Sequence, residues 1–178
     1  MNYKIILFVS LLFSCLKILG QQILPKKVET NSYKIEFPSA PDKTTQTIST
    51  AIGDLELIII AYEVKESAKD DNYVYMVMET NYPDSLIKKP NFDIEKFFRQ
   101  SIDGAVNNVK GKIISENPTR SGKYDSRQIE IDYGNGVAVI KMVMILRESK
   151  LIMLQTITDS KKYPNNSIAA FFNSFEIK

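Results

Sequence analysis

Residues 127–158, RQIEIDYGNGVAVIKMVMILRESKLIMLQTIT, predict three consecutive antiparallel strands. β-Branched and apolar residues dominate this segment, and two groups of turn residues, 134–136 (GNG) and 148–150 (ESK), divide it. The strands are expected at Arg127–Tyr133, Val137–Arg147 and Leu151–Thr158. Ile129 and Ile131 alternate with polar residues in the first strand, so one face of that strand is expected to meet solvent, as an antiparallel sheet permits.

An amphipathic helix is predicted upstream of these strands, over Asn91–Val109. Its apolar residues recur at intervals of three and four: Ile94, Phe97, Phe98, Ile102, Ala105, Val106 and Val109. Gly104 lies within this pattern and costs about 1 kcal/mol of helix stability relative to alanine. We therefore expect the helix to pack closely at Gly104 on the part of the structure that lies below it.

Further strands complete an α+β fold. They are expected at Tyr33–Phe37, Thr44–Ile52, Leu55–Val64, Tyr73–Thr80 and Lys112–Glu116. A short C-terminal helix is predicted after Pro164, with Ser167 as its N-cap. The predicted fold is an antiparallel β-sheet of about six to eight strands, packed by one long central helix and a short C-terminal helix.

The chain ends in AAFFNSFEIK, residues 169–178, which is rich in phenylalanine. Phe171 and Phe175 are four residues apart and share a helical face with Ile168. Burial of each phenylalanine against the sheet would contribute about 1.5–3 kcal/mol, which would anchor the C-terminus. The alternative is an exposed aromatic patch, which is unusual on a soluble domain.

Several of these features together resemble the PsbP-like superfamily. They are the strand that ends in Phe37–Pro41 (FPSAP), the long helix, the run of antiparallel strands and the closing Phe171–Phe175 (FFNSF). The resemblance implies an antiparallel sheet between helices, and binding or scaffolding rather than catalysis. It supplies no catalytic residues to carry over to this chain.

Residues 1–20, MNYKIILFVSLLFSCLKILG, have the pattern of a secretory signal peptide, with cleavage expected after Gly20. Residues 21–31 are then a polar lead-in, and residues 32–178 form a single PsbP-like domain. This predicts a periplasmic or secreted protein. The alternative is lipidation at Cys15, the only cysteine, because residues 12–15 (LFSC) partly match a lipobox; the product would be an outer-membrane lipoprotein.

Charge argues against a nucleic-acid-binding surface, and hydropathy argues against a transmembrane helix in the mature chain. Loss of Lys4 and Lys17 with the signal peptide leaves 21 basic and 21 acidic residues, so no basic surface for nucleic acid is expected. No later stretch approaches the ~18 apolar residues of a spanning helix, so no transmembrane helix is expected after signal removal.

Catalytic chemistry finds little support, and we expect no enzyme and no cofactor. The sequence has no histidine, which excludes histidine-based nucleophile activation and histidine metal sites. The carboxylate pair Glu130 and Asp132 fits a solvated strand face, and the pair Asp70 and Asp71 fits a loop. No glycine-rich phosphate-binding loop is present.

Methionines raise the possibility of a Cu(I) site. Met76 and Met78 would share one strand face, as would Met142 and Met144, and thioethers are ligands for Cu(I). Such a site requires these side chains to converge at the surface. The alternative, which we favour, is that they fill the core between the sheet and the long helix.

Two short motifs could be modified after export. Ser85 lies in Asp84–Leu86 (DSL), which fits an O-glycosylation pattern of some bacteria. Residues 165–167 (NNS) form an N-glycosylation sequon, although Ser167 is explained by its expected role as a helix cap.

We expect an exported, non-catalytic binding or accessory module that contacts an envelope protein or complex. Its contact surface is expected on a sheet face or on the loops Lys65–Asp71 and Ser85–Pro90, since loops on rigid scaffolds often carry function. The alternative is a carrier that holds a lipid or small apolar molecule between the sheet and the helix. A cavity beyond a few hundred cubic ångströms at that place would favour the carrier.

Overall fold

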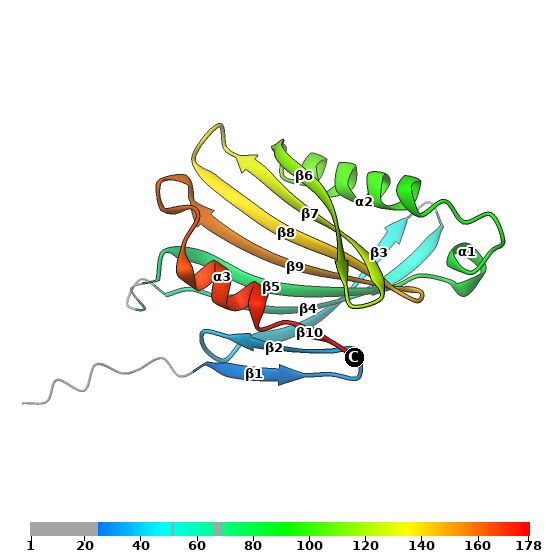
Figure 1. Ribbon diagram of the computed structural model, residues 1–178, viewed down its shortest axis with the longest axis horizontal. Coiled ribbons are helices and arrows are strands. Elements are labelled where there is room, and N and C mark those ends of the chain that lie inside the picture. Colours follow the sequence, from blue (N-terminus) through cyan, green and yellow to red (C-terminus); the bar gives the residue numbers. More distant parts are fainter. Residues whose placement is uncertain (1–24, 51, 66–67, 69) are drawn as a thin grey trace, which may run out of the picture.

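The computed structural model describes residues 25–178 except 51, 66–67 and 69. The predicted signal peptide, including Cys15, lies outside the described residues. The described chain is an α+β fold with two antiparallel sheets and three α-helices (Figure 1).

The larger sheet has seven strands, in the order β3-β4-β5-β9-β8-β7-β6. The strands are β3 (Asp42–Thr50), β4 (Gly53–Glu63), β5 (Asn72–Asn81), β6 (Lys112–Ser121), β7 (Tyr124–Tyr133), β8 (Ala138–Arg147) and β9 (Lys150–Asp159). Two meanders, β3–β5 and β6–β9, meet where β5 pairs with β9. The three strands predicted from residues 127–158 are confirmed as β7, β8 and β9.

A smaller sheet is formed by β1 (Lys26–Glu29), β2 (Tyr33–Phe37) and β10 (Glu176–Ile177). The seven strands of the larger sheet agree with the predicted six to eight, and β2 has the predicted bounds, but β2 does not join that sheet: it pairs with β1 and β10. Residues 21–31 were expected as a lead-in, and their described part contains β1. This strand pairs with β2 along its whole length, from Lys26 opposite Phe37 to Glu29 opposite Lys34.

The helices are α1 (Asp84–Ile87), α2 (Ile94–Asn108) and α3 (Asn166–Asn173), and η2 (Ser160–Lys162) is a short 3-10 helix. α2 lies over one face of the seven-stranded sheet, while α3 and the smaller sheet cover the other face (Figure 1). The seven-stranded sheet is thus the middle layer, and α2 belongs to an outer one. The predicted N-cap of the C-terminal helix is wrong: the side chain of Asn165, not Ser167, accepts the hydrogen bond from the Ile168 backbone N–H at 2.9 Å.

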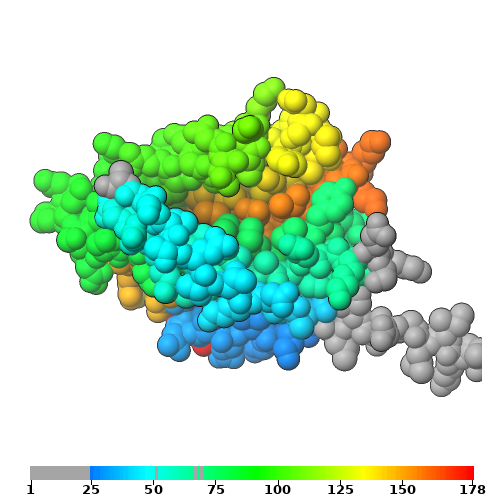
Figure 2. Space-filling model, turned by 180° about the vertical axis from the view of Figure 1, so that it is seen from behind, coloured from blue at the N-terminus to red at the C-terminus, as the bar shows by residue number. Residues whose placement is uncertain are grey.

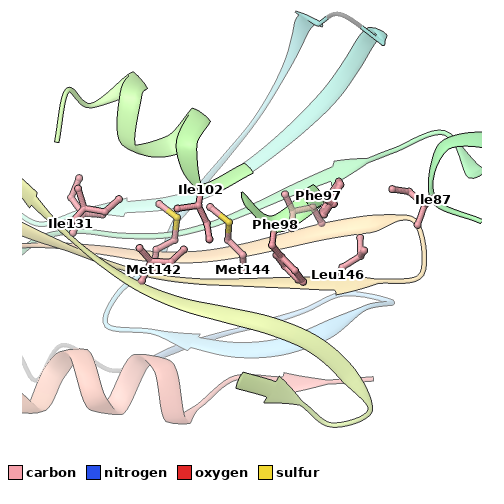
Figure 3. Close-up of a cluster of buried hydrophobic side chains, with 11 residues drawn as sticks. Ile87, Phe97, Phe98, Ile102, Ile131, Met142, Met144 and Leu146 are labelled. Atoms are coloured by element: carbon pink, nitrogen blue, oxygen red, sulfur yellow. The ribbon is translucent and has the colours of Figure 1, made fainter. Parts of the chain in front are cut away.

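Two hydrophobic cores follow from this layering. Under α2, Phe98 and Ile102 pack against Met142 and Met144 of β8, with Leu146 further along that strand (Figure 3). Alternate residues of β8 and β9 point to the opposite face, where they meet β2 and α3. Each central strand is therefore apolar on both faces.

The predicted anchor at the C-terminus is confirmed for Phe171. This side chain is 2% exposed, and its ring makes edge contacts with Phe37 at 5.3 Å and Tyr75 at 5.2 Å between centroids. Phe175 is half-buried and its ring lies 5.5 Å from that of Tyr33. The C-terminal phenylalanines thus attach the smaller sheet to the larger one.

Candidate functional site

A groove separates α2 from the half of the sheet formed by β3, β4 and β5. Its volume is about 530 Å³, and we call it the α2 groove. Figure 2 shows the face on which it opens, hollowed between the green helix and the cyan β3–β4 hairpin, with the orange β9 at the bottom. The hollow exists because α2 packs over β7, β8 and β9 and leaves β4 and β5 uncovered on this face.

The lining of the α2 groove is mostly apolar and carries no charged side chain among the described residues. Its apolar residues come mainly from the strands: Ile48, Leu55, Leu57, Met76, Met78, Ile131, Ile140, Met142, Leu151 and Met153. Binding pockets for small molecules are typically of this size, mostly apolar, with a few polar groups that fix orientation. Methionine side chains adapt to ligands of different shape, because they are unbranched and polarisable.

A small number of uncharged polar groups also face the groove. Gln155 lies on the floor and is 7% exposed, so its side-chain amide is a polar group within a largely apolar surface. Tyr82 lines one side, and burial raises the pKa of its hydroxyl above the ordinary value. Tyr82 is therefore neutral at physiological pH, and the groove offers hydrogen bonds without charge.

Gly104 lies on the wall of the α2 groove, and the prediction that it packs closely on something is wrong. A Cβ atom built at this position would meet nothing within 4 Å, apart from the helix's own backbone. The glycine therefore leaves space beside the groove instead of permitting a close approach. A side chain placed there would extend into the space that a ligand would use.

A second hollow continues the α2 groove along the same sheet face. It has a volume of about 990 Å³, and it shares Met76 with the α2 groove. Its lining adds Ile59 and Ala61 of β4, and its rim carries charged residues: Asp42, Glu63 and Lys65. Leu55, Leu57, Ile59 and Ala61 alternate along β4 on this face, so the two hollows form one apolar path.

The four methionines considered for Cu(I) occupy two environments. Met142 and Met144 are 3% and 0% exposed beneath α2, where Figure 3 shows them against Ile102. Met76 and Met78 are half-buried and line the α2 groove, which Met142 also borders from below the helix. The structure thus provides no exposed set of these four thioethers. Within the described residues, no group of three or more acidic, histidine or cysteine side chains could hold a metal ion either.

The carboxylate pairs make structural hydrogen bonds. Glu130 accepts a hydrogen bond from the Tyr163 hydroxyl at 2.5 Å, while Asp132 accepts one from a turn N–H after β7 at 2.6 Å. Asp70 accepts a hydrogen bond from the Tyr75 hydroxyl at 2.7 Å. Burial is the main cause that raises the pKa of Tyr75 and Tyr163, and the carboxylates of Asp70 and Glu130 raise it further. The two pairs therefore serve to fix tyrosines and a turn in place.

The predicted modification and contact sites lie away from the α2 groove lining. Ser85 is exposed on α1, so the loop expected at Ser85–Pro90 begins within a helix. The loop Lys65–Asp71 lies only partly within the described residues. The side-chain amide of Asn165 in the glycosylation sequon donates to Asn72 at 3.1 Å while its oxygen caps α3. Modification at these sites and contact with an envelope protein stay predictions.

Comparison with known proteins shows a shared fold. No family model matches the chain. No curated protein matches its sequence. Among solved structures, the solution structure of cyanobacterial PsbP (CyanoP) from Synechocystis sp. PCC 6803 is similar, with a TM-score of 0.51 and 12% identity over 88% of this chain and 94% of that one.

A protein of unknown function from Pseudomonas aeruginosa, PA94, described as a putative regulator, matches with a TM-score of 0.41 and 11% identity over 82% of this chain and 90% of that one. In the described part of the chain, no helix is both long enough and apolar enough to cross a membrane. The likeness to CyanoP concerns the fold alone, and the chain has a PsbP-like fold.

Proposed function

We propose that this protein is an exported, non-catalytic binding module that carries a neutral, apolar small molecule in the α2 groove. The observation that carries the proposal is the hollow of about 530 Å³ between α2 and the sheet, lined by aliphatic and methionine side chains. This hollow lies between the helix and the sheet, the place expected for a carrier's ligand, and it has the size of a small-molecule site. The expectation of export comes from the signal peptide pattern of residues 1–20.

The absence of charge from the described lining selects the chemical class of the ligand. A fatty acid bound head-first would bring its carboxylate into an apolar groove without a cation, and burial of an unpaired charge is costly. A neutral molecule avoids this cost. One carbonyl or hydroxyl group on it could reach the Gln155 amide on the groove floor.

The second hollow supports an elongated ligand. Because Met76 borders both hollows, an apolar chain that leaves the α2 groove could continue over Ile59 and Ala61. Any polar end would then reach the charged rim at Glu63 and Lys65. Binding rather than turnover is expected, since Tyr82 is the one titratable side chain among the described lining residues of the α2 groove.

The test is a pair of phenylalanine substitutions on one helix. Gly104→Phe places a ring into open space of the α2 groove, whereas Asn107→Phe adds the same ring at an exposed position outside the groove lining. Binding of the neutral dye Nile red, measured by fluorescence, should weaken about tenfold or more in Gly104→Phe and stay within about twofold of wild type in Asn107→Phe. Equal dye binding by all three proteins would overturn the proposal.

A further inference from the structure

A pocket on the opposite face of the sheet differs in charge from the α2 groove. It lies between α3 and the strands β6, β7 and β8, with a volume of about 400 Å³, and we call it the α3 pocket. Two cationic residues, Arg120 and Lys141, line it, and none of the described lining residues is acidic. By contrast, the hollow beside α1 is lined by both acidic and basic residues, including Asp84, Glu148 and Lys150.

Lys141 is held inside the α3 pocket without a carboxylate partner. Its side chain is half-buried on β8, with Nζ 5.0 Å from the centre of the Phe172 ring. Glu130 lies directly opposite on β7, but its carboxylate accepts the hydrogen bond from Tyr163. No carboxylate of the described chain lies within 4.0 Å of the Lys141 ammonium group. An ammonium group in such surroundings favours an anion as its partner.

The remaining walls suit a flat apolar body. Val143 and Leu154 form part of the sheet side, and the phenylalanines Phe172 and Phe175 contribute from α3 and the segment that follows it. Gln128 adds an uncharged side-chain amide beside the cation. Aromatic walls favour planar groups by stacking, and partial exclusion of water strengthens the attraction between opposite charges.

From these observations we infer that the α3 pocket binds a small organic anion with a planar apolar body. The carboxylate of this ligand contacts Lys141, and its planar body packs against Phe172 and Val143. This site is separate from the α2 groove, because the seven-stranded sheet lies between them. It does not depend on the function proposed for that groove.

The experiment compares two probes of nearly the same shape, the anion 1-naphthoate and the neutral 1-naphthamide, in which an NH2 group replaces one carboxylate oxygen. Isotope-labelled methyl groups of Val143, Leu154 and Ile177 report on the α3 pocket, and those of Met76 and Met78 report on the α2 groove, in NMR titrations of the full chain. We expect naphthoate to shift the α3 pocket methyl signals and to bind about tenfold more tightly than naphthamide.

A matched lysine variant separates this site from general charge attraction. Lys123 also lies over an aromatic ring, with Nζ 5.4 Å from the Tyr124 centroid, but it is exposed and does not line the pocket. Lys141→Gln should weaken naphthoate binding about tenfold, whereas Lys141→Arg and Lys123→Gln should stay within about threefold of wild type.

Three results would overturn the inference. The first is equal binding of naphthoate and naphthamide to the wild-type protein, a comparison that requires no variant to fold. The second is naphthoate shifts confined to the methionines of the α2 groove. The third is the same loss of affinity in the Lys141→Gln and Lys123→Gln variants.

Discussion

Gly104 and the methionines Met76 and Met78 differ from the buried core residues in having open space beside them. A core methionine such as Met144 is fully enclosed, whereas Met78 lines the α2 groove. Because Gly104 has no side chain, α2 leaves open space at this point of the groove wall. The capacity of the groove is thus set by single residues on both of its walls.

The Gly104→Ala variant should be more stable than wild type. The helix has ordinary geometry at this position and a Cβ would meet nothing within 4 Å, so the methyl group adds no clash. Alanine lowers the entropy of the unfolded chain, and we expect a gain of about 0.5–1 kcal/mol in the free energy of unfolding, measured by urea denaturation. A loss of stability would mean that the space beside Gly104 is already filled.

Phe171→Ala should be one of the most destabilising substitutions in the C-terminal segment. The buried Phe171 ring contacts both Phe37 of the smaller sheet and Tyr75 of the larger one. We expect a loss of about 3–5 kcal/mol in the free energy of unfolding. Phe172→Ala is the control: this neighbour is half-buried and should cost clearly less. Equal losses would contradict the assignment of Phe171 as the anchor.

At the scale of the element, α2 packs on the sheet along one face and forms one wall of the groove. Asp93 caps the helix by accepting a hydrogen bond from the Lys96 backbone N–H at 2.9 Å. Phe97, Phe98 and Ile102 are its buried residues. Gly104 and Asn108 border the groove, and Ala105 contacts both the groove and the core. The helix thus packs on the core and lines the groove over much of the same length.

Removal of the cap should weaken this helix. Asp93→Ala is expected to lower the free energy of unfolding by about 1 kcal/mol, because an N–H at the helix start loses its partner. Asp103→Ala provides the comparison on the same helix, where it breaks only an exposed ion pair with Arg99 at 3.0 Å and should cost less than about 0.5 kcal/mol. Thermal unfolding of both variants measures these losses. A larger loss of stability in Asp103→Ala than in Asp93→Ala would contradict the capping role.

The positions of most elements could be predicted from local pattern, whereas several boundaries could not. β2 matches its predicted range, and the ends of β8 and β9 lie within one residue of theirs. β6 was predicted to stop at Glu116 but continues through Pro118 to Ser121. This is possible because β6 is an edge strand, where a missing backbone N–H leaves no ladder bond unmade. A local pattern does not reveal which strand lies at an edge.

At the scale of the whole molecule, the division into two sheets and the α2 groove were beyond sequence reasoning. β2 pairs with β10, and these strands are at opposite ends of the chain. Their alternation of apolar residues looks the same whichever sheet they join. The groove depends on how far one helix extends across seven strands, which follows from packing and not from the sequence of α2. The apolar residues Leu55 and Leu57 could be recognised in the sequence, but the sequence did not reveal that α2 would leave this face of β4 uncovered.

The absence of charge in the α2 groove leads to a prediction about pH. Tyr82 is the one titratable side chain among its described lining residues, and burial raises the pKa of this hydroxyl further above neutrality. Nile red affinity should therefore stay constant between about pH 5 and pH 9, since no lining group changes its charge in that range. A fluorescence titration that shows a transition within this range would contradict an uncharged site.

The central claim is that the α2 groove holds a neutral, apolar molecule in the protein's natural setting. Native mass spectrometry of the protein purified from its own host, as wild type and as Gly104→Phe, tests this most directly. We expect the wild type to carry an additional mass that organic extraction removes and that is absent from Gly104→Phe. An identical set of masses in the two proteins, with or without a bound molecule, would contradict the claim.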